Sequence, residues 1–236
     1  MNQRFKKPWH LLSIMMLSSL FLAGCSSSNS FSPPVLTPMA TYEVTIVNAT
    51  NNQPLSPVVV VAHAPGFTIW TAGTAASIEL EYIAEGGSAA ELVASLLLEE
   101  SATGIGSINP GGNETITLES FFGHSMISVA TMLVNTNDAF TGVQSIDVSG
   151  MAQGDSMTIS ANAYDAGTEA NSEATNTMPG PVEGGMGEGF NVARNDLNLV
   201  TGHRGVVTAD DGLATSVLDE SHRFDNTVMM VTISRI

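Results

Sequence analysis

Short apolar runs separated by turn residues constrain the fold of this chain more than any other feature. Several runs alternate apolar and polar residues, as at 42–48, and the run at 58–62 is continuously apolar and mostly β-branched. Alternation is typical of a strand with one buried face, and a short continuous run is consistent with a strand buried on both faces. About eight such runs predict a mainly β fold, an antiparallel β-sandwich. They lie at 42–48, 58–62, 114–119, 126–135, 143–148, 156–164, 197–207 and 228–236.

One stretch departs from this pattern. Apolar residues recur at helical spacing from Ile78 to Ile83, and the glycines at 86–87 supply a helix stop. Ser88 and Glu91 have the spacing of a capping box, in which two side chains satisfy free backbone N–H groups at a helix start. This predicts a second helix that ends at about Glu100. We therefore expect a short helical insertion between strands of the sandwich.

The first 24 residues have the pattern of a secretory signal peptide. Arg4, Lys6 and Lys7 form a basic start, an apolar run follows at 11–22, and small residues precede Cys25. An apolar run of this length is too short to span a bilayer, which needs about 20 residues. The segment 1–24 is therefore predicted to direct export and to be removed.

The segment Leu22-Ala23-Gly24-Cys25 resembles the lipobox of bacterial lipoproteins. The resemblance implies cleavage before Cys25 and lipid attachment to that cysteine, so the chain would be anchored to a membrane by several acyl chains. Ser26, where such proteins carry Asp for inner-membrane retention, points to the outer membrane of the cell envelope. The alternative is an ordinary secreted protein with a free Cys25.

The segment that follows is rich in serine and proline. Residues 25–40 are predicted to be a lipidated tether, partly extended, which places the domain at 41–236 away from the membrane surface. Cys25 is the only cysteine of the chain, so no intramolecular disulfide is available. Stability must come from burial, hydrogen bonds or bound metal.

Acidic side chains dominate the predicted mature protein. All 23 Asp and Glu residues lie beyond Cys25 and only four arginines accompany them, so the formal charge is 4 − 23 = −19. Such a chain repels nucleic acid, which excludes a phosphate-backbone partner. Strong acidity favours solubility and the binding of divalent cations.

Several segments of the chain resemble the spondin-type domain, the module near the N-terminus of F-spondin and mindin that also occurs alone in bacterial proteins. The matching segments are 42–46, 71–76, 84–87, 128–140 and 164–169, together with His203-Arg204-Gly205 and the terminal Val-Thr-Ile. The resemblance implies a C2-like β-sandwich with bound calcium and, in animal members, extracellular adhesion. This chain departs from the animal pattern in lacking cysteines in the domain and in having Asn137-Asp138-Ala139-Phe140 where those members have Pro-Asp-Trp.

The same resemblance carries the metal role onto Asp138, Asp165 and Glu169. Asp165 and Glu169 flank Ala-Gly-Thr just after a strand, and Gly167 can adopt the positive φ that lets the chain turn back. Calcium takes six to eight oxygen ligands, and carboxylates on loops at one end of a sandwich suit it. The residue pattern alone leaves open that these are solvated loop acids.

We expect a non-enzymatic, calcium-binding module of the cell envelope that binds an extracellular or envelope protein or glycan, in adhesion or in another interaction. A metal-dependent envelope hydrolase is an alternative, which requires acids and a histidine to converge in a deep pocket. The histidines His63, His124, His203 and His222 show no zinc-site spacing, and no catalytic triad motif is recognisable. A structural or assembly lipoprotein is the third possibility.

Overall fold

The computed structural model describes residues 40–97, 99–121, 123–183 and 187–236. The predicted signal peptide, the lipidation site at Cys25 and the predicted tether up to residue 39 lie outside the described residues. Within the described part of the chain, neither helix is long and apolar enough to cross a membrane.

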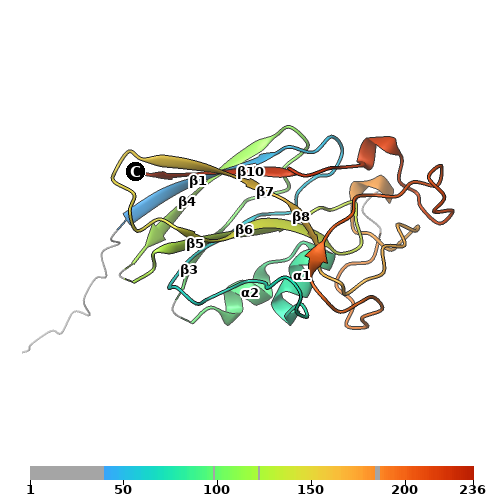
Figure 1. Ribbon diagram of the computed structural model, residues 1–236, viewed down its shortest axis with the longest axis horizontal. Helices are drawn as coiled ribbons and strands as arrows, with labels where there is room; N and C mark the ends of the chain where they lie inside the picture. The colour runs from blue at the N-terminus through green and yellow to red at the C-terminus, as the bar shows by residue number, and fades with distance from the viewer. Residues whose placement is uncertain (1–39, 98, 122, 184–186) are drawn as a thin grey trace, which may run out of the picture. The chain divides into compact units, whose positions relative to one another are not determined.

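Two antiparallel sheets form the body of the domain. One has the strand order β4 (Asn113–Ser120), β1 (Ala40–Asn48), β10 (Met229–Arg235) and β7 (Ser156–Ala161). The other has the order β3 (Glu100–Thr103), β2 (Val59–His63), β5 (Met126–Met132), β6 (Ala139–Asp147), β8 (Ala163–Asp165) and β9 (Thr201–Gly202). Figure 1 shows the sheets as stacked layers with the helices against the six-stranded one. The predicted mainly β sandwich with a helical insertion is confirmed.

A separate hydrophobic core lies on each face of the six-stranded sheet. Between the sheets, Val58 and Val60 of the β2 region pack with residues such as Ile46 of β1. On the other face, Val59 and Val61 pack with the residues of the helices. Because side chains alternate along a strand, a strand between two cores must be apolar at every position, which explains the continuous run at 58–62.

The first helix, α1 (Ile78–Gly86), forms where it was predicted. The side chain of Ser77 accepts a hydrogen bond from the backbone N–H of Leu80, and Gly87 ends the helix in the left-handed conformation with φ of 65°. A Cβ atom on Gly87 would lie 2.7 Å from the Cβ atom of Ser56, so close packing also favours glycine there. Leu80 and Ile83 face the sheet and are almost fully buried.

The second helix, α2 (Ala90–Ser95), is shorter than predicted. The residue before its first turn is Ala89, and the Ser88 hydroxyl accepts from the backbone N–H of Ala90 at 3.4 Å, so the predicted capping box of Ser88 and Glu91 does not form. The chain becomes extended at Leu96 and then enters β3, which pairs with β2. The prediction of helix up to Glu100 is therefore wrong, because pairing at the sheet edge outweighs local helix propensity.

Two of the predicted strands also differ in the structure. The segment predicted as one strand at 156–164 is divided at Asn162, so that β7 joins the four-stranded sheet and β8 the six-stranded sheet. In the segment 197–207, only β9 pairs as a strand, and long loops fill most of the chain between β8 and β10. These loops lie together at the right-hand end in Figure 1 and carry most of the candidate site.

Candidate functional site

Strand pairing brings two of the predicted acids close to one another. Asp138 directly precedes β6, and Asp165 is the last residue of β8. Ala139 pairs with Asp165 across the ladder, so the chain that leaves β8 turns over the chain that enters β6. The backbone N–H of Ala166 donates to the carbonyl oxygen of Asp138 at 3.2 Å. Residues 167–169 consequently wrap around the Asp138 side chain.

This turn depends on Gly167. Its φ is +70°, as the sequence predicted, and a Cβ atom at this position would lie 2.4 Å from the carbonyl oxygen of Leu199. A side chain is therefore excluded by both backbone conformation and space. The turn directs the backbone N–H groups of Thr168 and Glu169 to the Asp138 carboxylate, at 2.8 and 3.0 Å.

Asp138 is a fully buried carboxylate with only one satisfied oxygen. Its Oδ2 atom accepts from the backbone of Thr168 and Glu169 and from the Thr168 hydroxyl at 3.2 Å. Its Oδ1 atom is buried and has no hydrogen-bond partner among the described residues. Burial, and then the charge of Asp165, raises the pKa of Asp138 to about 7 despite the three donors.

Glu169 shares this environment. Its exposed fraction is 7%. Burial raises its pKa to about 8, with further contributions from the charges of Glu85, Asp138 and Glu188. Near neutral pH, Asp138 and Glu169 therefore hold protons for part of the time unless a cation neutralises them.

Glu85 is a third member of this group, and the sequence did not single it out. It lies in the last turn of α1, is fully buried, and accepts a hydrogen bond at Oε2 from the backbone N–H of Asn191 at 2.8 Å. Its Oε1 atom has no hydrogen-bond partner among the described residues. Burial raises the pKa of Glu85, and the hydrogen bond from the backbone N–H of Asn191 is the largest influence that lowers it.

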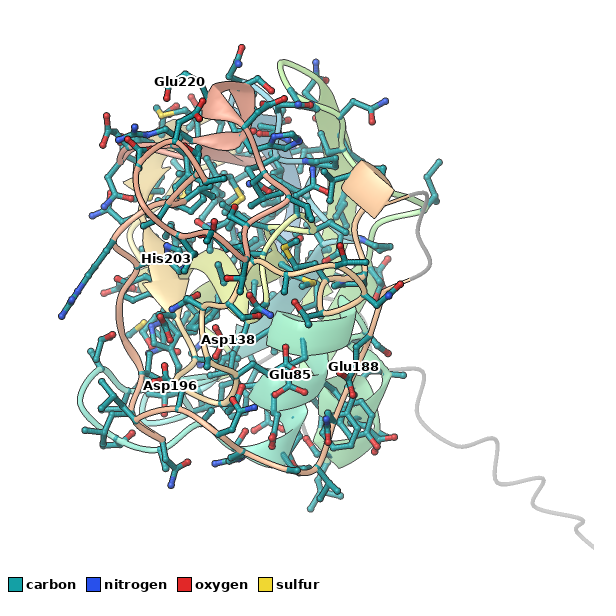
Figure 2. All side chains as sticks on the ribbon, turned by 90° about the vertical axis from the view of Figure 1, so that its right-hand side faces the viewer. Glu85, Asp138, Glu188, Asp196, His203 and Glu220 are labelled. Carbon is teal, nitrogen blue, oxygen red and sulfur yellow. The ribbon has the colours of Figure 1, made fainter. Side chains whose placement is uncertain are left out.

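The loop that covers Glu85 is fixed on the helix. Phe190 stacks on Tyr82 of α1 with ring centroids 3.7 Å apart. In the same loop, the backbone of Asn191 donates to Glu85, and the charge of Glu188 acts on Glu169. Figure 2 shows Glu85, Asp138 and Glu188 at the same end of the domain. We call Glu85, Asp138 and Glu169 the buried acid cluster.

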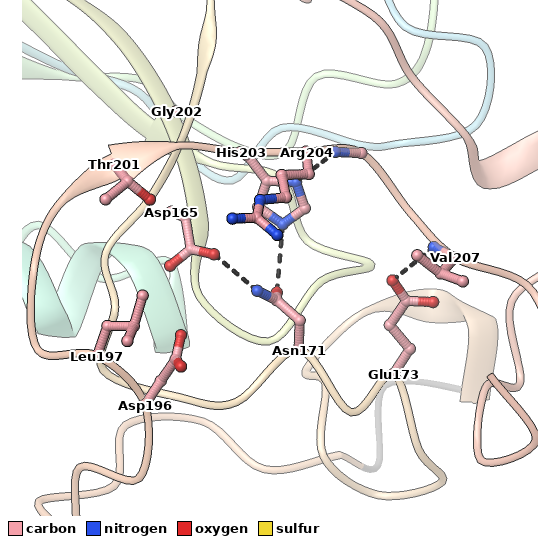
Figure 3. A pocket seen from close by; sticks show the side chains of 11 residues that line it. Asp165, Asn171, Glu173, Asp196, Leu197, Thr201, Gly202, His203, Arg204 and Val207 are labelled. Carbon is pink, nitrogen blue, oxygen red and sulfur yellow. Dashed lines mark hydrogen bonds between the residues drawn. The ribbon is translucent and has the colours of Figure 1, made fainter.

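Asp165 is adjacent to this cluster but directed elsewhere. Its Oδ1 atom accepts from the backbone N–H of Gly167 at 2.7 Å, and its Oδ2 atom accepts from the Asn171 side chain at 2.6 Å. The carboxylate lines a cavity with Asn171 and His203 (Figure 3). The structure thus brings Asp138 and Glu169 together and adds Glu85, whereas Asp165 acts on Asp138 through its charge.

The carboxylate oxygens of the cluster are the type of ligand that a hard cation prefers. Among the described residues, the Asp138 Oδ1 and Glu85 Oε1 atoms are the only buried side-chain nitrogen or oxygen atoms without a hydrogen bond, and both are carboxylate oxygens. Carboxylates are preferred calcium ligands. As they stand, no three acidic, histidine or cysteine side chains in the described part of the chain are grouped closely enough to hold a metal ion. Binding would therefore require side-chain rotation within the cluster.

A protein cation neutralises a neighbouring acid instead. Glu81, one helical turn before Glu85, has an exposed fraction of 1% and binds Arg194 through both oxygens, at 3.0 and 2.5 Å. Arg194 also donates to the carbonyl oxygen of Ala76 and to Asn198. The charge of Arg194 also lowers the pKa of Glu85, but its effect is smaller than those of burial, the hydrogen bonds and the Glu81 charge. The buried acid cluster therefore has no direct protein cation among the described residues.

The Spondin_N family model matches residues 40–180. This chain belongs to the Spondin_N family. The match confirms the resemblance inferred from the sequence segments. It includes Glu85, Asp138, Asp165 and Glu169, whereas the loop that carries Glu188 and the strand β9 lie beyond the matched part of the spondin domain. No curated protein matches the sequence.

Proposed function

We propose that this protein is an envelope lipoprotein whose spondin domain binds calcium and serves in adhesion, by binding a protein or glycan, without catalysing a reaction. One observation carries the calcium proposal: the Oδ1 atom of Asp138 is buried and accepts no hydrogen bond from any described residue. A carboxylate oxygen in that position is costly unless it is protonated or bound to a cation.

Three side chains would hold the ion. Asp138 and Glu85 each offer one oxygen without a partner among the described residues, and Glu169 lies beside Asp138 with its pKa raised by burial and then by the neighbouring acids. Bound calcium would supply the positive charge that the cluster lacks and would accept the remaining oxygens from carbonyl groups or water. Because Glu85 belongs to the helical insertion and Asp138 to the sandwich, an ion shared by them would fix one against the other.

The cavity beside the cluster supports binding more than hydrolysis. It brings Asp165 and His203 together, as the hydrolase alternative requires. However, the His203 Nδ1 atom accepts from the backbone N–H of Gly205 at 3.0 Å, and Nε2 contacts the amide oxygen of Asn171 at 3.3 Å. With both ring nitrogens engaged, His203 has no free atom to act as a general base on bound water.

The anchoring part of the proposal rests on the N-terminal sequence. The basic start, the apolar run and the lipobox-like end at Cys25 support export and lipid attachment. A lipid anchor would hold the domain at a membrane of the cell envelope, and Ser26 favours the outer membrane. Loops at one end of the sandwich are the natural place for partner contacts.

Calcium binding is tested by isothermal titration calorimetry on the full chain in detergent. We expect the wild type to bind calcium with a stoichiometry of about one per chain and Asp138→Asn to lose measurable binding. Glu43→Gln is the matched control, because Glu43 is an exposed acid on β1. Equal binding by the wild type and Asp138→Asn would place any calcium elsewhere and would remove this part of the proposal.

Anchoring is tested separately by growth with radiolabelled palmitate. We expect label in the wild-type protein and none in Cys25→Ala, which should leave the membrane fraction. Unlabelled wild-type protein would favour an ordinary secreted form.

A further inference from the structure

A cavity lined by several charged and polar side chains lies next to the buried acid cluster, on the other side of Asp165. Its volume is about 260 Å³, and its walls come from β8, β9 and the loops that follow each of them. Figure 3 shows Asp165, Asn171 and His203 in its centre, with Asp196 below Asp165 and the Arg204 side chain overlapping His203 in this view. Both β9 and the loop with Asp196 lie outside residues 40–180, the part of the chain that the family model matches.

Side chains in the centre of the cavity are fixed by a continuous series of hydrogen bonds. Asn171 donates to Asp165 at 2.6 Å, and its amide oxygen lies 3.3 Å from the Nε2 atom of His203. The backbone N–H of Gly205 donates to His203 Nδ1, so the ring proton resides on Nε2 and points to Asn171. Burial lowers the pKa of His203, which favours this neutral form. In the centre of the cavity, Asp165 is therefore the one charged side chain of the three, and hydrogen bonds hold all three in fixed positions.

Two opposite charges at the cavity have no protein partner within the part of the chain that the structure describes. Among the described residues, neither Arg204 nor Asp196 makes a side-chain hydrogen bond or ion pair, although both line the cavity. The other described arginines are all engaged: Arg194 with Glu81, Arg223 with Asp211, and Arg235 with the carbonyl oxygen of Met151. Glu173, a third acid of the cavity, is occupied by the backbone N–H of Val207 and the hydroxyl of Ser216.

We propose that this cavity binds a free α-amino acid as a zwitterion. Arg204 would receive the carboxylate, because a guanidinium presents two parallel donors to it. Asp196, with Asp165 beside it, would receive the ammonium group. A ligand with no net charge also suits a strongly acidic protein, which repels anions. The cavity has room for a small ligand of this kind and not for a folded partner.

The first test screens the twenty standard amino acids by thermal shift, with the full chain in detergent and a calcium chelator present. The chelator makes the result independent of the calcium proposal. For the strongest ligand, calorimetry then compares the free amino acid with its amide, which lacks the anion, and with its N-acetyl derivative, which lacks the cation. We expect each blocked form to bind at least about tenfold more weakly, the equivalent of one charge-assisted hydrogen bond.

Variants then locate the site. Arg204→Gln and Asp196→Asn should each weaken binding at least about tenfold and leave the melting temperature without ligand unchanged, since both residues are exposed. Arg223→Gln is the matched control, because that arginine does not line this cavity and should not alter binding. The proposal is overturned if no amino acid binds, if a blocked form binds as tightly as the free one, or if Arg204→Gln binds like the wild type.

Discussion

Two glutamates on one helix show how differently this protein treats buried charge. Glu81 and Glu85 are one turn apart on α1, with exposed fractions of 1% and 0%. Glu81 is bound at both oxygens by Arg194. Glu85 has one backbone donor and, within the described residues, an unused oxygen beside the acids of the sandwich. The first site is complete within the chain, and the second requires a cation or protons from outside.

The largest effect is expected where the charge is already compensated. Arg194→Gln leaves Glu81 buried without its cation, so we expect the free energy of unfolding to fall by about 3–5 kcal/mol. Urea denaturation measures this free energy, and we expect the same loss in the presence of calcium and in the presence of a chelator. The double variant with Glu81→Gln should recover much of the loss, because no buried charge remains. Equal losses in the single and double variants would contradict this interpretation of Glu81.

The uncompensated site should respond to pH instead. Without calcium, Asp138 and Glu169 have pKa values raised to about 7 and about 8, so the folded state binds more protons than the unfolded state. The stability that this provides is fully present below the unfolded pKa values near 4 and is lost as pH rises through the folded ones. We expect the free energy of unfolding in chelator to fall by on the order of 2–4 kcal/mol between pH 6 and pH 7.5. A flat profile would mean that the two acids titrate normally.

A smaller effect is expected from neutralising Glu85. In chelator at pH 8, Glu85→Gln removes one of several crowded negative charges and retains an acceptor for Asn191, so we expect a gain of about 1 kcal/mol. In calcium the same variant should lose stability relative to the wild type. Chemical denaturation under both conditions measures the difference, and a loss in chelator would indicate that the carboxylate is satisfied as it stands.

The smallest effect is expected at an exposed ion pair. Arg223 contacts Asp211 at 3.0 Å and Glu220 at 3.3 Å, and all three side chains are largely exposed. Arg223→Gln should change the free energy of unfolding by less than about 1 kcal/mol, and added salt should reduce the change further. A loss comparable with that of Arg194→Gln would show that burial is not what separates the two arginines.

Local patterns in the sequence were sufficient for most of the fold. Alternation predicted β1 and β10, and helical spacing with the glycine stop predicted α1. The division of the segment 156–164 at Asn162 was not predictable, because the transfer of the chain between sheets depends on contacts far apart in sequence. The pairing of β3 with β2 likewise replaced the end of the predicted second helix.

The candidate site was predicted only in part, because it too depends on contacts between residues far apart in sequence. Asp138 and Glu169 meet because β6 and β8 pair in the structure, whereas the sequence linked these two acids only through the resemblance to the spondin-type domain. Glu85 joins them only through packing of α1 on the six-stranded sheet. One signal in the sequence was its spacing, because Glu85 lies four residues after Glu81 and therefore on the same face of the predicted helix. The direction of Asp165 depends on Gly167 and Asn171, which capture both of its oxygens.

Thermal unfolding in calcium and in chelator, for the wild type and Asp138→Asn, tests the proposed calcium site most directly. At a calcium concentration about 100-fold above Kd, linkage gives about 2.7 kcal/mol of stabilisation, which corresponds to a rise of about 5–10 °C for a domain of this size. We expect that rise in the wild type and in the exposed-acid control Glu43→Gln, and its loss in Asp138→Asn. An unchanged melting temperature in the wild type, or an equal rise in Asp138→Asn, would contradict a calcium ion bound by the buried acid cluster.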